Sequence, residues 1–271
     1  RGPGLVRMGC IDDATGKAFG RFYGYEGTMP AMDCFKRYAR RYGLARSVYL
    51  DKHTTYKSPG KLTPEEELRG LIEPQSQFER ALNELGVEVI HANSPQAKGR
   101  IERLFKTLQD RLVKEMRLRG IKTKEEANRF LGGYLARHNK RFGRLPSAEG
   151  DLHGTAPDDL DEFLCIKTKR ALRNDFTIAH EGKLYQILES VRARELAVEE
   201  KIDGRMLIKH NGGVLRFKEI SARPPREKPL KPFKARKKYI PPKDHPWRKH
   251  SPVAKKRSFL FWRKEDISTL A

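Results

Sequence analysis

The chain has 271 residues, and its net charge of +22 with a pI near 10.0 favours an anionic polymer, nucleic acid first, as its partner. No long apolar run or lipidation motif is present, so a membrane partner is not expected. The cysteines Cys10, Cys34 and Cys165 are far apart and form no C-x-x-C pair, which argues against a zinc site or a disulfide framework. Without a signal peptide, we expect a cytoplasmic protein with reduced thiols.

An alternation of strands and helices is predicted for residues 1–145. The spacing of apolar residues indicates, in order, a strand, a strand, a helix, a strand, a helix, a strand and a long helix, at Leu5–Ile11, Ala18–Tyr25, Thr28–Tyr42, Ser47–Leu50, Gln77–Leu85, Val87–Ile90 and a stretch ending near Leu118. This order is typical of an α/β fold with one hairpin and some parallel strands in a mixed sheet. Sites in such sheets form at the carboxyl ends of strands.

Local signals place several ends of these elements. Asp12 and the residues up to Gly16 have the composition of a turn, so the first two strands form a hairpin. Thr28 can cap the first helix, and Gly43 can end it. A further helix is predicted at Lys124–Phe142, although it contains the costly pair Gly132-Gly133.

The second half of the chain changes character. Residues 146–167 are predicted to be a linker, and residues 168–220 show short alternating stretches separated by glycine turns, which indicate a small all-β barrel domain. Residues 221–271 are rich in Pro and Lys, with 16 Lys and Arg against 4 Asp and Glu. Such a segment cannot bury a core, so we expect a disordered basic tail.

Two carboxylates lie where a site could form. Asp51 follows a predicted strand, and Glu102 lies early in the long helix that follows another strand. Carboxylates that converge in a basic protein suggest Mg²⁺ or Mn²⁺, whose remaining ligands are waters and substrate phosphates. Two carboxylates are few for two ions, so a third would be expected. The alternative is that Glu102 is an ordinary glutamate favoured by the helix dipole.

The segment HANSPQAKGRIERLFKTLQDRLVKE, together with IDDATGK and LDKHTTY, resembles the integrase core of bacterial insertion-sequence transposases of the DDE class, of the ISNCY-like type. The resemblance covers about Arg1 to Ile220, and the tail segment IPPKDHPWRK also resembles the ends of those proteins. It implies an RNase H-like integrase core over roughly Leu5–Phe142. It also implies two divalent ions in the complete enzyme, a homo-oligomer on DNA, and a nucleoid-associated location in bacteria.

Catalytic roles are carried over position by position. Asp51 matches the second catalytic aspartate of the family and Glu102 its glutamate, and both would be catalytic and metal-binding residues. The family's first aspartate matches nothing here, because it lies on a strand upstream of where this sequence starts. Asp12 and Asp13 are interpreted as turn residues instead. The family's N-terminal helix-turn-helix also has no counterpart, so we expect an N-terminally truncated chain.

Several residues near the two carboxylates are candidate DNA contacts. His53 would point to the same side as Asp51 and could touch phosphate, and Asn93 could contact DNA or simply cap the long helix. The basic residues of that helix could line a DNA backbone or form a solvated surface; they are Lys98, Arg100, Arg103 and Lys106.

The resulting hypothesis is a DNA transposase that cuts transposon ends and joins the 3′-hydroxyl to target DNA. Two alternatives stay open. One is a catalytically inactive remnant that binds DNA through its charge. The other is an RNase H-like nuclease that cuts without joining.

Overall fold

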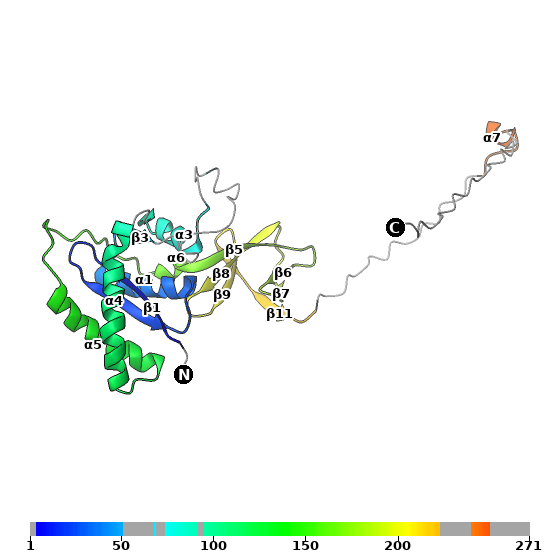
Figure 1. Cartoon of the computed structure of the whole chain (residues 1–271). Coiled ribbons are helices and arrows are strands. Elements are labelled where there is room, and N and C mark those ends of the chain that lie inside the picture. Colours follow the sequence, from blue (N-terminus) through cyan, green and yellow to red (C-terminus); the bar gives the residue numbers. More distant parts are fainter. Residues whose placement is uncertain (1–3, 51–67, 69–73, 92–94, 223–239, 250–271) are drawn as a thin grey trace, which may run out of the picture. The chain divides into compact units, whose positions relative to one another are not determined.

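The computed structural model describes residues 4–50, 68, 74–91, 95–222 and 240–249. It divides into two compact units, Arg1–Pro224 and Pro225–Ala271. The first unit contains α/β elements followed by antiparallel strands, as the sequence predicts (Figure 1). Three predicted site residues, Asp51, His53 and Asn93, lie outside the described residues. No helix within these ranges is long and apolar enough to cross a lipid bilayer.

An antiparallel hairpin begins the fold. Its strands are β1 (Val6–Ile11) and β2 (Ala18–Tyr23). The Asp12 carboxylate accepts hydrogen bonds from the backbone N–H of Thr15, at 3.1 Å, and from the Thr15 hydroxyl. Gly16, with a φ of 68°, adopts the left-handed conformation that favours glycine. The interpretation of Asp12 as a turn residue is confirmed.

Helices cover both faces of this hairpin. Helix α1 (Thr28–Tyr42) packs on one face, and helices α4 (Pro95–Leu118) and α5 (Lys124–Phe142) pack on the other. Successive side chains of a strand point to opposite faces. Met8 therefore joins the core cluster of α1, while Phe22 joins the cluster of α4 and α5.

The predicted bounds of α1 and α5 are confirmed, but the predicted cap of α1 is wrong. Gly27 occupies the N-cap position without any side-chain hydrogen bond, and its carbonyl accepts from the Ala31 N–H at 3.1 Å. Helix α1 therefore starts one residue earlier than a Thr28 cap would place it. Helix α5 does begin with a capping box, in which Thr123 and Glu126 satisfy each other's backbone N–H groups.

A second pair of strands runs parallel. It consists of β3 (Ser47–Leu50) and β4 (Glu88–His91), with α3 (Gln77–Glu84) before β4. We expected one mixed sheet, but the described strands of this part form two separate two-stranded sheets. Side-chain packing, rather than backbone hydrogen bonds, joins them, because Met8 and Leu50 share one buried cluster.

Two antiparallel sheets make up the all-β part. Their strands are β5 (Cys165–Ala171), β6 (Thr177–His180), β7 (Lys183–Ile187), β8 (Glu195–Lys201), β9 (Met206–His210), β10 (Gly213–Leu215) and β11 (Phe217–Ile220). The sheet orders are β10-β9-β8-β5 and β11-β7-β6, packed around Ile178, Val198 and Ile208. A closed barrel was predicted, and this is wrong for the strands described. The chain crosses between sheets at Arg216, so β10 pairs with β9 while β11 pairs with β7.

Two elements lie in the span that we expected to be a linker. These are α6 (Leu160–Phe163) and the start of β5 at Cys165. A tertiary contact fixes β5: the Gln77 side chain of α3 accepts from the Lys167 N–H at 2.9 Å and donates to its carbonyl at 3.0 Å. The polar sequence of β5 shows no strand pattern; the strand forms because it pairs along its whole length with β8.

The predicted disorder of residues 221–271 stays a prediction, since most of this segment lies outside the described residues. Within residues 240–249, which the structure describes, Pro246–Lys249 forms the one-turn helix α7. It belongs to the second compact unit.

Candidate functional site

The carboxyl ends of β3 and β4 meet at one edge of their sheet. Leu50, the last residue of β3, pairs with His91, the last residue of β4. Asp51 follows Leu50 directly, and α4 begins at Pro95. The chain therefore leaves both strands at the same edge, where α/β sheets carry their sites. The distance between the carboxylates of Asp51 and Glu102 stays a prediction, because Asp51 lies outside the described ranges.

Glu102 lies on the exposed side of α4. The opposite side of the helix is a buried stripe, formed by Leu104, Leu108 and Leu112 as predicted. Glu102 borders a shallow, open hollow in the surface together with Gly99, Arg103 and Lys106. Each of these positions is three or four residues from another along the helix, and Gly99 and Lys106 are seven apart, so they share one side. The structure thus brings three predicted site residues together.

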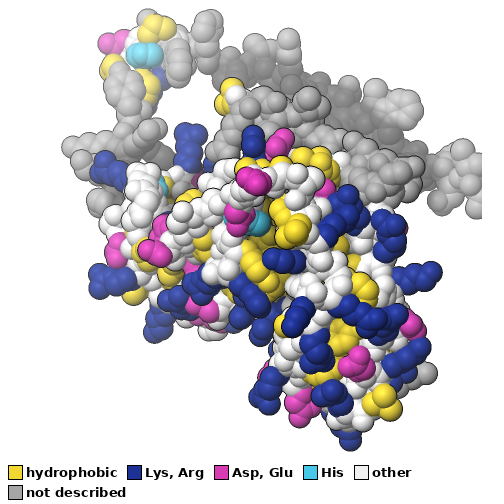
Figure 2. Space-filling model, turned by 90° about the vertical axis from the view of Figure 1, so that its left-hand side faces the viewer, with side chains coloured by type: hydrophobic (Ala, Val, Ile, Leu, Met, Phe, Trp, Pro, Cys, Tyr) yellow, Lys and Arg dark blue, Asp and Glu magenta, His cyan; other side chains and the backbone are white. Residues whose placement is uncertain are grey.

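Electrostatics make this hollow suited to an anion beside a metal ion. Arg103 is held along the helix, because its Nε donates to the carbonyl of Gly99 at 2.9 Å. Within the described part of the chain, Glu102 forms no hydrogen bond or ion pair, so its oxygens are available to a ligand. Figure 2 shows Lys and Arg side chains (dark blue) covering more of the displayed face than Asp and Glu (magenta).

Arg100 does not join this hollow. Its Nη1 donates to the backbone carbonyl of Asp13 at 2.6 Å and to the Asp13 carboxylate. The pair fastens α4 to the hairpin turn, and exposed pairs of this kind contribute only about 0–1 kcal/mol. A phosphate could therefore compete for Arg100. Lys98 lies in the first turn of α4, where the side chains are outside the description.

Sequence reasoning missed one polar pair near the strand edge. His91 Nε2 lies 2.6 Å from Glu79 Oε1, and Glu79 is only 6% exposed. Glu79 also caps α3, since its Oε2 accepts from the Ser76 N–H at 2.6 Å. The S-x-x-E spacing signals that cap, but nothing in the sequence connects it to His91. The pair ties α3 to the end of β4 from which the chain departs toward α4.

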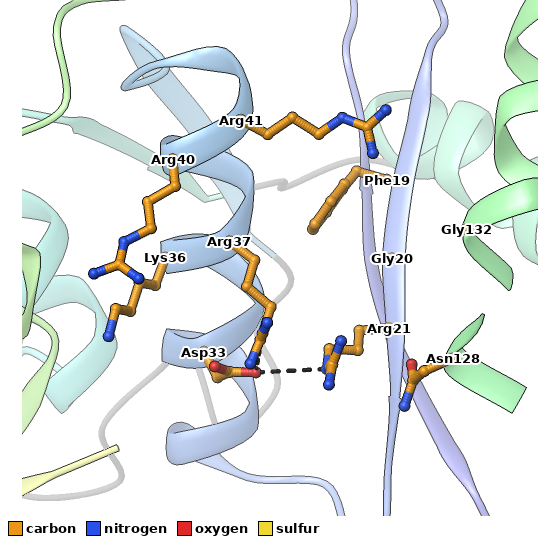
Figure 3. Close-up of a pocket in the computed structure, with 10 residues that line it drawn as sticks. All are labelled: Phe19, Gly20, Arg21, Asp33, Lys36, Arg37, Arg40, Arg41, Asn128 and Gly132. Atoms are coloured by element: carbon orange, nitrogen blue, oxygen red, sulfur yellow. Dashed lines mark hydrogen bonds and ion pairs between the residues drawn. The ribbon is translucent and has the colours of Figure 1, made fainter. Parts of the chain in front are cut away.

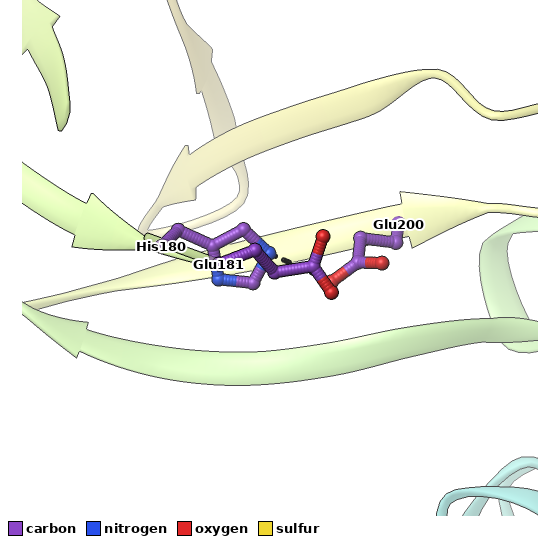
Figure 4. Close-up of side chains that lie close together, drawn as sticks. All are labelled: His180, Glu181 and Glu200. Atoms are coloured by element: carbon purple, nitrogen blue, oxygen red, sulfur yellow. Dashed lines mark hydrogen bonds and ion pairs between the residues drawn. The ribbon is translucent and has the colours of Figure 1, made fainter. Parts of the chain in front are cut away.

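A group of His180, Glu181 and Glu200 in the all-β part has ligand atoms within 4.8 Å of one another (Figure 4). Hydrogen bonds explain it. Arg170 Nε donates to His180 Nδ1 at 3.1 Å, which leaves the proton on Nε2 to donate to Glu200 Oε1 at 2.7 Å. Both ring nitrogens are thus occupied, and a metal ion would have to break one of these bonds.

No family model matches the chain. Among curated proteins, it is similar to a protein of Sinorhizobium fredii that carries the name transposase y4bF, with 34% identity over 227 residues. It is also similar to the transposase for insertion sequence IS1202 of Streptococcus pneumoniae, with 28% identity over 257 residues. These matches cover 80% and 88% of this chain but 48% and 53% of the two relatives. The chain therefore spans about half the length of the transposase-named proteins to which it is similar.

Proposed function

We propose that this chain forms the catalytic part of a DNA transposase of an insertion sequence. The observation that carries the proposal is the similarity to two transposase-named proteins over most of the chain. The net charge of +22 supports a nucleic-acid substrate. The finer assignment is a DDE-class, ISNCY-like transposase that cuts transposon ends and joins the 3′-hydroxyl to target DNA as a homo-oligomer in the bacterial cytoplasm.

The proposed fold of residues 1–145 is an RNase H-like integrase core. Support comes from an antiparallel hairpin, a parallel pair of strands and helices on both faces of the hairpin. The shared edge of β3 and β4 supports the site, because Asp51 follows β3 and the helix of Glu102 follows β4.

The proposed cofactors are two Mg²⁺ or Mn²⁺ ions, held by Asp51 and Glu102. The exposed Glu102 carboxylate fits a hard cation, which prefers oxygen ligands. Such ions, when bound, activate a water or a 3′-hydroxyl and stabilise the leaving oxygen. Arg103 and Lys106, on the same side of α4, would contact the DNA phosphates and fix the scissile bond beside Glu102.

Two isosteric substitutions test the assignment. Asp51→Asn and Glu102→Gln, introduced into the full product of the coding region, should each reduce strand transfer by about 1,000-fold, since a metal contributes several kcal/mol to phosphoryl transfer. DNA affinity should change by only a few fold. Asp110→Asn is the matched control, because Asp110 is an exposed carboxylate of the same helix, paired with Lys114. Joining by either site variant at the wild-type rate would refute the assignment.

The net charge of +22 also supports a second function, DNA binding without catalysis, because phosphate contacts alone give such affinity. The acidic residues of the hairpin turn do not add to the proposed metal site, since both are already engaged. Asp12 is bound by Thr15, and Asp13 is bound by Arg100. In that case, salt-sensitive DNA binding would persist while Mn²⁺-dependent nicking of plasmid DNA would be absent. Hydrolysed ends without joined products would instead indicate a nuclease.

A further inference from the structure

A basic pocket of about 430 Å³ lies between α1, the outer strand β2 and α5 (Figure 3). Five of its lining residues are cations, from α1 and from β2: Arg21, Lys36, Arg37, Arg40 and Arg41. A single carboxylate, Asp33, lines it with them. None of these residues was singled out in the sequence.

Two asparagines of α5 fix the distance between this helix and the outer edge of β2. The Asn128 amide accepts from the Phe22 N–H at 2.8 Å and donates to its carbonyl at 3.0 Å. Asn139 makes the same double contact with Ala18, at 2.8 Å in both directions. Gly20 lies between these two residues on the same edge, because alternate residues of a strand present their peptide groups to the same side. The hydrogen bonds of the two asparagines go to Phe22 and Ala18 and not to the peptide group of Gly20.

Glycine gives the pocket its depth on the α5 side. Gly132 lines the pocket opposite Gly20 (Figure 3). A Cβ atom at Gly132 would meet no atom within 4 Å, so the missing side chain leaves open space rather than avoiding a clash. A glycine that costs helix stability thus stands where the pocket is open, and Gly20 also lines this pocket.

The Asp33 carboxylate already has hydrogen-bond partners inside the pocket. Its Oδ2 accepts from the Tyr23 hydroxyl at 2.7 Å and from Arg37 Nε at 2.8 Å, and its side chain is only 14% exposed. Arg21 Nε lies 3.8 Å from the same oxygen. One carboxylate thus orients two guanidinium groups and cannot neutralise both. Lys36 is neutralised separately by Asp161, at 2.7 Å.

The remaining cations are not compensated. Arg40 and Arg41 are exposed, and neither forms an ion pair with a residue whose placement is described. Arg41 instead lies over the Tyr42 ring, 5.2 Å from its centroid. Positive charges gathered without counter-charges repel one another, and a bound anion would relieve that repulsion. We infer that this pocket binds the phosphodiester backbone of a nucleic acid.

The geometry favours a polymer of phosphates. Arg37, Arg40 and Arg41 lie within about one turn of α1 and extend over about 6 Å of its axis, with Arg40 and Arg41 pointing to different sides (Figure 3). One DNA strand presents about two phosphates over that length. Planar guanidinium groups bind phosphate oxygens in pairs, and the Gly20 N–H on the strand edge adds a neutral donor.

This contact differs from the proposed catalytic surface. The pocket lies on the side of the hairpin where α1 packs and Arg21 meets Asp33, whereas Glu102 is on α4, which packs on the opposite face. The inference goes beyond the proposed function, because it holds for a nucleic-acid-binding protein with or without catalysis.

The test compares two charge-removing double variants. Arg40→Ala/Arg41→Ala should weaken binding of a random-sequence duplex by roughly tenfold or more near 0.1 M salt. It should also reduce the slope of log K against log salt by about 1–2, since each phosphate contact contributes about 0.9. Arg205→Ala/Arg216→Ala removes the same charge from exposed sites of the all-β part and should leave the slope unchanged. Binding is measured in EDTA, so a failure of the catalytic assignment does not affect the result.

A neutral variant separates the pocket from the general charge. Gly132→Leu places a side chain in this space, where its Cβ would meet no atom within 4 Å, and should weaken duplex binding severalfold at a melting temperature equal to or above that of the wild type. An unchanged slope and affinity in both pocket variants would overturn the inference. An equal loss of affinity in the control variant would also overturn it. So would a pocket variant that no longer binds polyglutamate but still binds DNA, because that result would indicate an acidic protein partner.

Discussion

Glu102 and Glu199 are carboxylates with opposite surroundings. Glu199, on β8, is 6% exposed, and its Oε2 lies 2.9 Å from Lys201 Nζ and 3.1 Å from Lys209 Nζ. Glu102 is exposed on α4, near cations that make no recorded bond with it among the described residues. A charged group that forms ion pairs inside the protein stabilises the fold. A charged group that forms none is available to a ligand. The same contrast separates Lys36 from the arginines of the basic pocket.

The surroundings of Glu199 also set its protonation. Burial raises the pKa of this carboxyl, but hydrogen bonds from Lys201 and Lys209 outweigh burial and lower the pKa below its usual range. Lys201 additionally donates to the carbonyl of Asp161, at 2.9 Å, which links β8 to α6. The ion cluster therefore connects the all-β part to the α/β part.

The largest effect on stability should distinguish these two glutamates. Glu199→Gln should lower the free energy of unfolding by about 3 kcal/mol, because Lys201 and Lys209 lose the counter-charge that they share in a buried place. Glu102→Gln should change it by less than about 0.5 kcal/mol. Urea unfolding followed by circular dichroism measures both. Equal losses would break the comparison.

The stability of the protein in acid should depend on the same ion cluster around Glu199. Because the pKa of Glu199 is lowered on folding, its contribution is fully present above the ordinary value of 4.5 and is lost as the pH falls through the folded pKa. The wild-type melting temperature should therefore fall more steeply below pH 4.5 than that of Glu199→Gln.

Lys201 does not obscure this measurement. Burial lowers its pKa, but the hydrogen bond to Glu199 raises it above the ordinary value of 10.5. Its contribution is present throughout the acid range and is lost only as the pH rises through the folded pKa. Parallel acid profiles for the two proteins would show that Glu199 is not the group responsible.

The smallest effect is expected at the hairpin turn. Asp13→Asn removes the carboxylate that pairs with Arg100. The side chain of Asp13 is 79% exposed and that of Arg100 is 42% exposed. Such a pair contributes about 0–1 kcal/mol. Thermal unfolding should shift by no more than a few degrees, because Arg100 keeps its hydrogen bond to the backbone carbonyl of residue 13. With the carboxylate removed, the protein should bind DNA slightly more tightly through Arg100. A large destabilisation would mean that α4 depends on this turn for its position.

Local patterns were sufficient for most of the helices. The apolar spacing predicted α1 and α5 with the bounds that the structure shows, and it predicted the buried stripe of α4. The exposure of Glu102 follows from its position beside that stripe. These features depend on residues within a few turns of one another, which a sequence displays directly.

Long-range contacts could not be predicted. Strand β5 pairs along its whole length with β8, which lies about 30 residues further on, and the pair of His91 with Glu79 depends on how α3 packs before β4. Closure of the strands into a barrel was expected from their number and spacing, but pairing is decided at Arg216, where the chain changes sheets. The basic pocket was also missed, because Arg21 and Asp33 meet only after β2 and α1 pack.

The asparagine contacts of α5 have a consequence for solubility. An outer strand with free peptide groups is a template on which another molecule can add a strand and start aggregation. Asn128 and Asn139 occupy the peptides of Phe22 and Ala18, so only a short stretch around Gly20 is left for such pairing. The arginines beside that stretch would repel an identical neighbour. Helix α5, which lines the basic pocket, thus also shields the β2 edge of the hairpin from the addition of another strand.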